Sequence, residues 1–107
     1  MGSGEADVLA TPAMVALMEK TAYMSVNAQL EQGQTTVGTM ITIEHLSATP
    51  VGMDVFCESK LINIDGKRLT FEVKAFDKSG CIGEGTHERF IVNSERFQLK
   101  ANEKLSQ

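Results

Sequence analysis

The sequence predicts an α+β domain in which one long helix precedes a curved antiparallel sheet of four strands. Apolar residues recur with a helical period of about 3.6 over residues 12–31, and the period changes to two after Gly33. Short turns separate the later strands, which are therefore expected to pair antiparallel. A chain of 107 residues has room for one domain, and we expect a single domain over residues 1–107.

The helix is expected to begin after Thr11, a good N-cap, with Pro12 as its first residue. Residues 13–18 (AMVALM) are apolar on every side, and Gly33 follows the end of the pattern. Because a helix that is apolar all round needs cover on all sides, we expect at least its first two turns to be fully buried. Either the concave face of a curved sheet wraps the helix, or a second subunit caps it.

Four strands follow the helix and are predicted at residues 35–46, 51–64, 67–76 and 81–92. Asp65-Gly66 is a strong hairpin signal between the second and third strands, and residues 77–80 form the next turn. Gly38 lies inside the first strand, where a glycine indicates either a bulge or the close approach of a ligand to the backbone. The last dozen residues are expected to form a polar tail or a short helix.

Composition and charge disfavour several classes of function. The net charge of −4 argues against broad electrostatic binding to nucleic acid, and no apolar run reaches the ~18–20 residues of a membrane span. The first residues carry no signal-peptide pattern, and no Cys/His spacing typical of a metal site is present. Cys57 and Cys81 form no CxxC pair and suit free thiols or one disulfide. We therefore expect a cytoplasmic protein without a nucleic-acid, membrane or metal partner.

Glu19 and His45 are the candidate acid and base. Glu19 ends the apolar run of the helix, and because an unpaired buried carboxylate is costly, such groups cluster at functional sites. The alternative for Glu19 is a surface carboxylate paired with a cation. His45 shares a strand face with Ile41 and Ile43, where an imidazole is either a general base or a structural histidine with satisfied nitrogens.

Other polar residues have both a structural and a functional interpretation. His87 and Arg89 alternate with Glu88 on the last predicted strand, and we expect them on a half-exposed face of the sheet. Besides capping, Thr11 would place its hydroxyl at the positive end of the helix, where an anion or oxyanion is stabilised. Either cysteine as a nucleophile would need a neighbouring base.

Three stretches carry a resemblance that, with the hairpin at residues 65–69 (DGKRL), covers nearly the whole chain from Val8. They are residues 8–19 (VLATPAMVALME), residues 37–50, which begin with VGT and end with ATP, and residues 83–90 (GEGTHERF). In these motifs the chain resembles hotdog-fold acyl-CoA thioesterases, of the branch that includes fluoroacetyl-CoA thioesterase. No single motif decides the resemblance, whereas the joint spacing of the matching Thr, Glu, Gly and His is fairly specific.

The resemblance implies a long helix wrapped by an antiparallel sheet, and a homodimer or dimer of dimers whose sheets join edge to edge. It places the active site at the subunit interface, with catalytic roles for Thr11, Glu19 and His45 and substrate contacts from Gly38 and Arg89. No cofactor is implied, because coenzyme A is part of the substrate. Members of this branch usually carry another N-terminal strand with lid aromatics. We expect the fold without that strand, and we do not carry over fluoroacetyl selectivity.

The expected function is hydrolysis of a small or medium acyl-CoA thioester to the free acid and CoA. The alternative is a non-catalytic hotdog module that binds acyl-CoA or another small ligand. Eight helical residues separate Thr11 from Glu19 by roughly 12 Å. These two residues therefore share a site only if their side chains lean together, a substrate or water bridges them, or they come from different protomers. Candidate cations for the CoA phosphates are Lys67, Arg68, Arg89 and Lys100.

Overall fold

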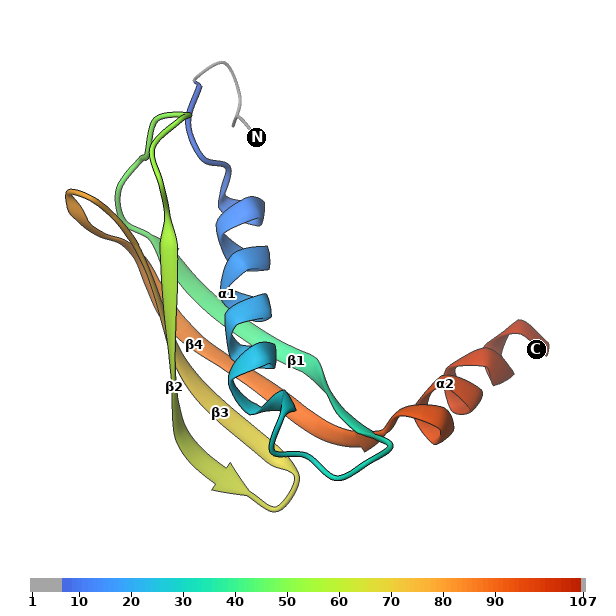
Figure 1. The fold of residues 1–107 in the computed structure, drawn as a ribbon. Helices are drawn as coiled ribbons and strands as arrows, with labels where there is room; N and C mark the ends of the chain where they lie inside the picture. The colour runs from blue at the N-terminus through green and yellow to red at the C-terminus, as the bar shows by residue number, and fades with distance from the viewer. Residues whose placement is uncertain (1–6, 107) are drawn as a thin grey trace.

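The structure is a computed structural model that describes residues 7–106. A long helix lies in the concave face of a curved sheet, and a second helix projects away from the end of the sheet (Figure 1). In chain order the elements are α1 (Thr11–Asn27), β1 (Gln34–His45), β2 (Phe56–Asp65), β3 (Arg68–Asp77), β4 (Gly80–Asn93), α2 (Ser94–Asn102) and the short 3₁₀ helix η1 (Glu103–Ser106). The predicted α+β architecture of one helix and four antiparallel strands is confirmed.

The start of α1 differs from the expectation in one detail. Ala10 is the N-cap, with an extended backbone and no side-chain cap, so Thr11 is the first residue of the helix itself. The prediction that the Thr11 side chain caps the helix is therefore wrong. Pro12 lies in the first turn as expected, because its missing N–H has no helical partner there. The helix ends at Asn27, before the predicted residue 31.

One row of α1 packs on the sheet. Met14, Met18 and Ala22 are fully buried and lie four residues apart, so they form a single stripe along the helix. On the opposite side Ala16 and Met24 are exposed. Within one chain the sheet therefore does not bury the helix on all sides, because it covers only one side and leaves the flanks half-buried. Cover by a second subunit, the other expected arrangement, stays a prediction.

The sheet is fully antiparallel, and its strand order is β1-β4-β3-β2. The last strand therefore lies inside the sheet, while β1 and β2 form its two edges. The register of β1 against β4 shifts between Gly38 and Met40, which confirms the predicted bulge. Five residues of β3 and β4 close the core beneath the buried row of α1, with Phe71 as the largest side chain: Leu69, Phe71, Val73, Ala75 and Ile82.

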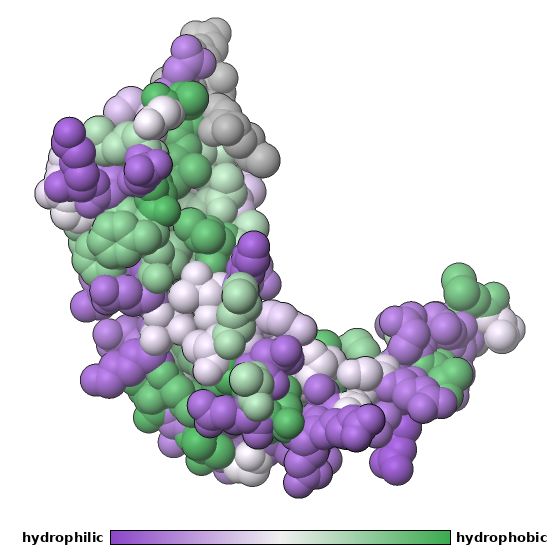
Figure 2. All heavy atoms as spheres, in the orientation of Figure 1, coloured by the Kyte–Doolittle hydropathy of each residue, from purple (hydrophilic) through white to green (hydrophobic). Residues whose placement is uncertain are grey.

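The C-terminal residues form α2 rather than an unstructured tail. Asn93 caps this helix by accepting a hydrogen bond from the backbone N–H of Arg96 at 2.9 Å. None of its residues is buried. In the space-filling view, hydrophobic residues gather where α1 crosses the sheet, and α2 stands apart from that region (Figure 2). Within residues 7–106, neither helix is long and apolar enough to cross a bilayer.

The segment between β1 and β2 is tied to the β3–β4 turn by a buried carboxylate. The hydroxyl of Thr49, which is 1% exposed, donates to Asp77 Oδ2 at 2.8 Å, and the backbone N–H of Ser79 donates to Asp77 Oδ1 at 2.8 Å. Thr49 also accepts the backbone N–H of Leu9 at 2.8 Å. These bonds fix the chain on either side of the N-terminal end of α1. The expected missing N-terminal strand concerns residues outside the described range.

The Asp77 network predicts a pH-dependent contribution to stability. Hydrogen bonds from Thr49 and Ser79 to the charged carboxylate lower the pKa of Asp77 below its ordinary value. Its stabilising contribution is therefore present above the pKa of the unfolded chain, and is lost as the pH falls through the lower folded value. Asp77→Asn is expected to be less stable than wild type in urea at pH 7, with a difference that shrinks towards about pH 3.

The matched control for this experiment is Asp65→Asn. Asp65 pairs with Arg68 at 2.9 Å, but both side chains are about half or more exposed, so its effect should be small. A stability difference between Asp77→Asn and wild type that stays constant from pH 7 to about pH 3 would contradict the role of the charged carboxylate.

Candidate active site

The predicted site residues lie in two groups along the seam between α1 and β1. The helix runs antiparallel to the strand, so Thr11 at the start of α1 meets His45 at the end of β1. Further along the helix, Glu19 lies beside Gly38. Arg89 reaches the same place from β4, where its backbone is paired with that of Gly38. The structure thus brings together Thr11 with His45, and separately Glu19 with Gly38 and Arg89.

The first group presents an imidazole with one free nitrogen. Thr11 Oγ1 and His45 Nδ1 are hydrogen-bonded at 2.8 Å, which orients the ring. His45 Nε2 is buried and has no hydrogen-bond partner among the described residues. An unsatisfied buried nitrogen costs about 1–3 kcal/mol, so a hydrogen-bond partner at Nε2 would stabilise this part of the structure. The ring borders a cavity of about 330 Å³, lined by Val8, Leu9, Thr11, His45, Leu46, Ser47 and Ala48.

The second group surrounds the bare backbone of Gly38. A Cβ atom at this position would lie 3.4 Å from both Glu19 Oε2 and Arg89 Nη1, and 3.3 Å from His87 Cε1. The missing side chain therefore leaves a narrow space between a carboxylate and a guanidinium. The bulge at Gly38 is confirmed, and side chains also approach its backbone closely. Close approach of a ligand, the other interpretation, stays a prediction. Oxyanion and carbonyl groups fit a site of this chemistry.

Arg89 is buried and held from several sides. Its Nε donates to Thr36 Oγ1 at 2.8 Å, its Nη2 donates to the Thr36 carbonyl at 2.9 Å, and the guanidinium lies 5.5 Å from the Tyr23 ring centroid. Burial lowers the pKa of Arg89 from its ordinary value, and the negative charge of Glu19 acts in the opposite direction. The guanidinium is therefore a fixed positive charge inside the protein and does not serve as a surface cation.

The expectation that His87 and Arg89 lie on a half-exposed face is wrong. They are 1% and 7% exposed. Because β4 is an inner strand between β1 and β3, side chains on its helix-facing side are enclosed.

Tyr23 and Thr36, which contact Arg89, were not among the predicted site residues, and His87 was predicted only for a half-exposed face. Tyr23 lies one helical turn after Glu19 on the same side of α1, a spacing that could have flagged it.

Within one chain the candidate acid and base do not meet. Eight helical residues place Glu19 roughly 12 Å of rise beyond Thr11. Seven strand residues place His45 roughly 23 Å of rise beyond Gly38. No described contact joins Glu19 to His45, so a site that uses both needs either a substrate or water that bridges them or residues from two protomers.

The remaining candidates have no role in either group. Cys57 and Cys81 are free thiols, and burial raises the pKa of Cys57, which disfavours the nucleophilic thiolate. Arg68 forms an exposed ion pair with Asp65 at the hairpin. Lys67 and Lys100 are exposed.

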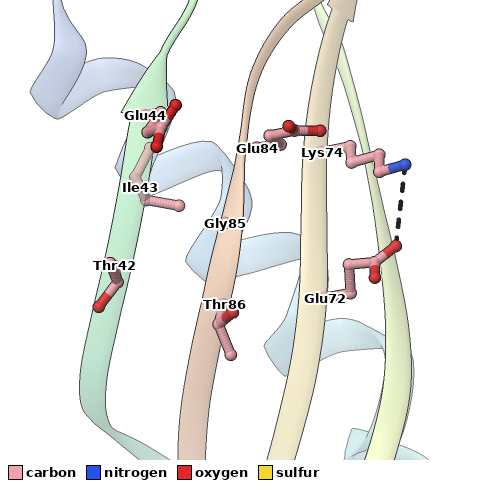
Figure 3. Close-up of a pocket in the computed structure, with 8 residues that line it drawn as sticks. All are labelled: Thr42, Ile43, Glu44, Glu72, Lys74, Glu84, Gly85 and Thr86. Atoms are coloured by element: carbon pink, nitrogen blue, oxygen red, sulfur yellow. Dashed lines mark ion pairs between the residues drawn. The ribbon is translucent and has the colours of Figure 1, made fainter.

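A second hollow of about 380 Å³ lies on the sheet face opposite α1 (Figure 3). Its lining is mostly polar: Thr42, Ile43, Glu44, Glu72, Lys74, Glu84, Gly85 and Thr86. Within it, Lys74 pairs with Glu72 at 3.8 Å, while Glu44 and Glu84 leave an excess of negative charge. This face contains none of the predicted site residues, and its composition is that of a solvated outer surface.

Comparison with known proteins identifies the family. A sequence model described as the fluoroacetyl-CoA-specific thioesterase FlK matches residues 1–95. A fluoroacetyl-CoA thioesterase from Streptantibioticus cattleyicolor is 39% identical over 98 residues, which are 92% of this chain and 70% of that protein. This chain belongs to the fluoroacetyl-CoA-specific thioesterase family. It is accordingly an acyl-CoA thioesterase, as the resemblance implied.

Solved structures agree with the family and its fold. A fluoroacetyl-CoA thioesterase superposes with a TM-score of 0.87 at 39% identity, covering 91% of this chain and 72% of that one. A variant of such an enzyme in complex with fluoroacetate and CoA has a TM-score of 0.90 at 37% identity, with coverages of 95% and 80%. A thioesterase-superfamily protein from Thermus thermophilus, 24% identical, has a TM-score of 0.91 over 99% and 81% of the chains and shows the shared fold. The expected hotdog fold is confirmed.

Gly38→Ala is expected to impair this thioesterase without unfolding it. The new methyl group would lie 3.3–3.4 Å from atoms of Glu19, Arg89 and His87, and would fill the space between them. The rate of acyl-CoA hydrolysis, measured as the release of free CoA, should fall roughly 10–100-fold, because small displacements of reacting groups have effects of this size. The free energy of unfolding should change by less than about 1 kcal/mol, since alanine also restricts the unfolded chain.

Glu84→Ala is the control, because Glu84 is exposed on the outer face of the inner strand β4, away from Gly38 and from the β1 edge. If Gly38→Ala retained full activity, the space beside Gly38 would not belong to the reaction site.

Proposed function

We propose that the enzyme hydrolyses a small acyl-CoA thioester at a site assembled from two copies of the chain. Glu19, Gly38 and Arg89 come from one subunit, and Thr11 and His45 come from the partner subunit. The observation that carries the proposal is the division of these residues into two groups along one edge strand. A cavity of about 330 Å³ beside His45 is at the small end of ligand sites, which favours a short acyl group.

The geometry of β1 supports a two-subunit site. As an edge strand, β1 has one row of unpaired backbone groups, which a second copy can satisfy by antiparallel pairing. A two-fold axis is the commonest symmetry of soluble oligomers. When β1 pairs antiparallel with the same strand of a second copy, the numbers of any two residues that lie opposite each other add up to the same value. An axis near residues 41 and 42 sets Gly38 opposite His45 of the partner subunit. Glu19 and the imidazole then flank one substrate.

The proposed reaction needs a base, a positive charge near the carbonyl oxygen and a donor for the leaving group. Water attacks the thioester carbonyl carbon while His45 Nε2 accepts its proton, and Glu19 orients the water and stabilises the resulting imidazolium. The carbonyl oxygen of the bound substrate lies near Arg89, which retains N–H groups beyond those bonded to Thr36 and His87, and this contact persists as the oxyanion develops. The C–S bond then breaks, and the CoA thiolate leaves with the proton returned by His45. The hydrogen bond between Thr11 and His45 Nδ1 keeps the imidazole ring oriented through both steps.

A direct assay tests the reaction. Release of free CoA is measured with fluoroacetyl-CoA, acetyl-CoA and a medium-chain acyl-CoA, for wild type, Glu19→Gln and His45→Ala. We expect turnover of the short thioesters, and a loss of roughly 10²–10⁴-fold in each variant, which is the typical contribution of a general base. Lys20→Gln, an exposed neighbour of Glu19, is the control. Undiminished rates in both site variants would overturn the mechanism.

Mixing the two inactive variants tests whether the site is shared. After dissociation and reassembly of equal amounts, about half of the dimers are hybrids, and each hybrid contains one site with both Glu19 and His45 intact. Activity should therefore return to about one quarter of wild type. If both residues acted within one chain, every site in the mixture would carry a defect, and the mixture would stay inactive.

A further inference from the structure

His87 is a buried histidine that the proposed reaction does not use as an acid or base. It is 1% exposed and lies on the inner strand β4. Both ring nitrogens have partners: Nδ1 is 2.8 Å from the carbonyl oxygen of Met40, and Nε2 is 3.2 Å from Arg89 Nη1. On one side the ring packs near Phe71, with centroids 6.3 Å apart. The ring therefore has a fixed orientation.

The two partners determine where the His87 proton lies. A carbonyl oxygen only accepts hydrogen bonds, so Nδ1 carries the proton and donates it to Met40. A guanidinium only donates hydrogen bonds, so Nε2 has no proton and accepts from Arg89. His87 is accordingly a neutral imidazole in the Nδ1–H tautomer. An imidazolium would lose the bond to Arg89 and place two positive charges side by side.

This ring links the two features that border the space at Gly38. Met40 is the residue at which the register of β1 resumes after the bulge, so the Nδ1 bond anchors the bulge. The Nε2 bond fixes Nη1, the guanidinium nitrogen nearest to Gly38, while Thr36 binds Nε and Nη2. The Cε1 atom between these nitrogens faces the space itself.

We propose that His87 is a positioning residue for the thioester site, and that it acts through two separable hydrogen bonds. The bond to Arg89 sets the guanidinium for substrate contact, and the bond to Met40 holds the Gly38 backbone where the carbonyl reacts. This proposal rests on the proposed function for its kinetic consequences. The tautomer assignment does not depend on that function.

Two substitutions, each of which keeps one of the two His87 hydrogen bonds, test the bonds separately. The side-chain amide of His87→Asn reaches the place of Nδ1 and retains a donor for Met40, but offers nothing to Arg89. The amide oxygen of His87→Gln reaches the place of Nε2 and accepts from Arg89, but leaves Met40 unbonded. We expect His87→Asn to raise the KM for acetyl-CoA roughly tenfold with a smaller change in kcat, and His87→Gln to lower kcat roughly tenfold with little change in KM.

Controls separate positioning from simple support of the fold. Glu88→Gln changes the neighbouring residue outside this network and should retain wild-type constants. In an Arg89→Ala background, His87→Asn should raise KM no further, because its effect passes through Arg89. Equal losses of kcat in His87→Asn and His87→Gln would overturn the proposal. The same increase in KM from His87→Asn in the Arg89→Ala background as in wild type would also overturn it.

The wild-type protein supplies a test that does not depend on variants that fold. Nitrogen-15 NMR of the imidazole side chains distinguishes the two neutral tautomers and the imidazolium. We expect His87 to show a protonated Nδ1 and an unprotonated Nε2 at neutral pH, whatever the state of His45. An Nε2–H tautomer or an imidazolium would overturn the proposal even if the kinetic constants agreed. If the protein hydrolysed no acyl-CoA yet showed the Nδ1–H tautomer, the proposed function would fail while the assigned network stood.

Discussion

The packing of one stripe of α1 on the sheet fixes where Thr11 and Glu19, the helical members of the two groups, lie against the strands. Met14, Met18 and Ala22 are fully buried against β3 and β4, so the rotation of the helix about its axis is set. That rotation brings Glu19 and Tyr23 to the flank above β1 and β4. It also places Thr11 at the far end of β1, beside His45. Any repacking of the stripe would therefore move both groups of site residues together.

Arg89 is the residue beside α1 whose burial most depends on hydrogen-bond acceptors from its neighbours. A buried guanidinium without partners would cost several kcal/mol, so its N–H groups must be satisfied. Thr36 supplies two acceptors and His87 supplies a third, while the Tyr23 ring covers one face. Glu19 lies nearby without forming an ion pair with Arg89 within the described contacts, so its carboxylate remains available. The hydrogen bonds from Thr36 and His87 thus hold the Arg89 guanidinium in place, while no described ion pair engages the Glu19 carboxylate.

Much of the fold, but only part of the site, could be predicted from the sequence. Periodicity and turn residues gave the helix, the four strands and the bulge at Gly38, because these are local features. The enclosure of His87 and Arg89 could not be predicted, because it depends on β4 lying between β1 and β3. Strand order is set by long-range packing and leaves no trace in the alternation of one strand. For the same reason Thr36, which accepts from Arg89 across the sheet, was missed.

The incomplete burial of α1 within one chain is connected with the proposed shared site. The apolar residues of α1 extend around the helix, yet the sheet of one chain covers only a single stripe. Val15 and Leu17 stay half-buried, and the β1 edge beside the helix has unpaired backbone groups. A second copy joined at β1 would satisfy that edge and bring further cover to the helix flank. The same contact would bring the imidazole of one copy to the carboxylate of the other, so one interface would serve both stability and chemistry.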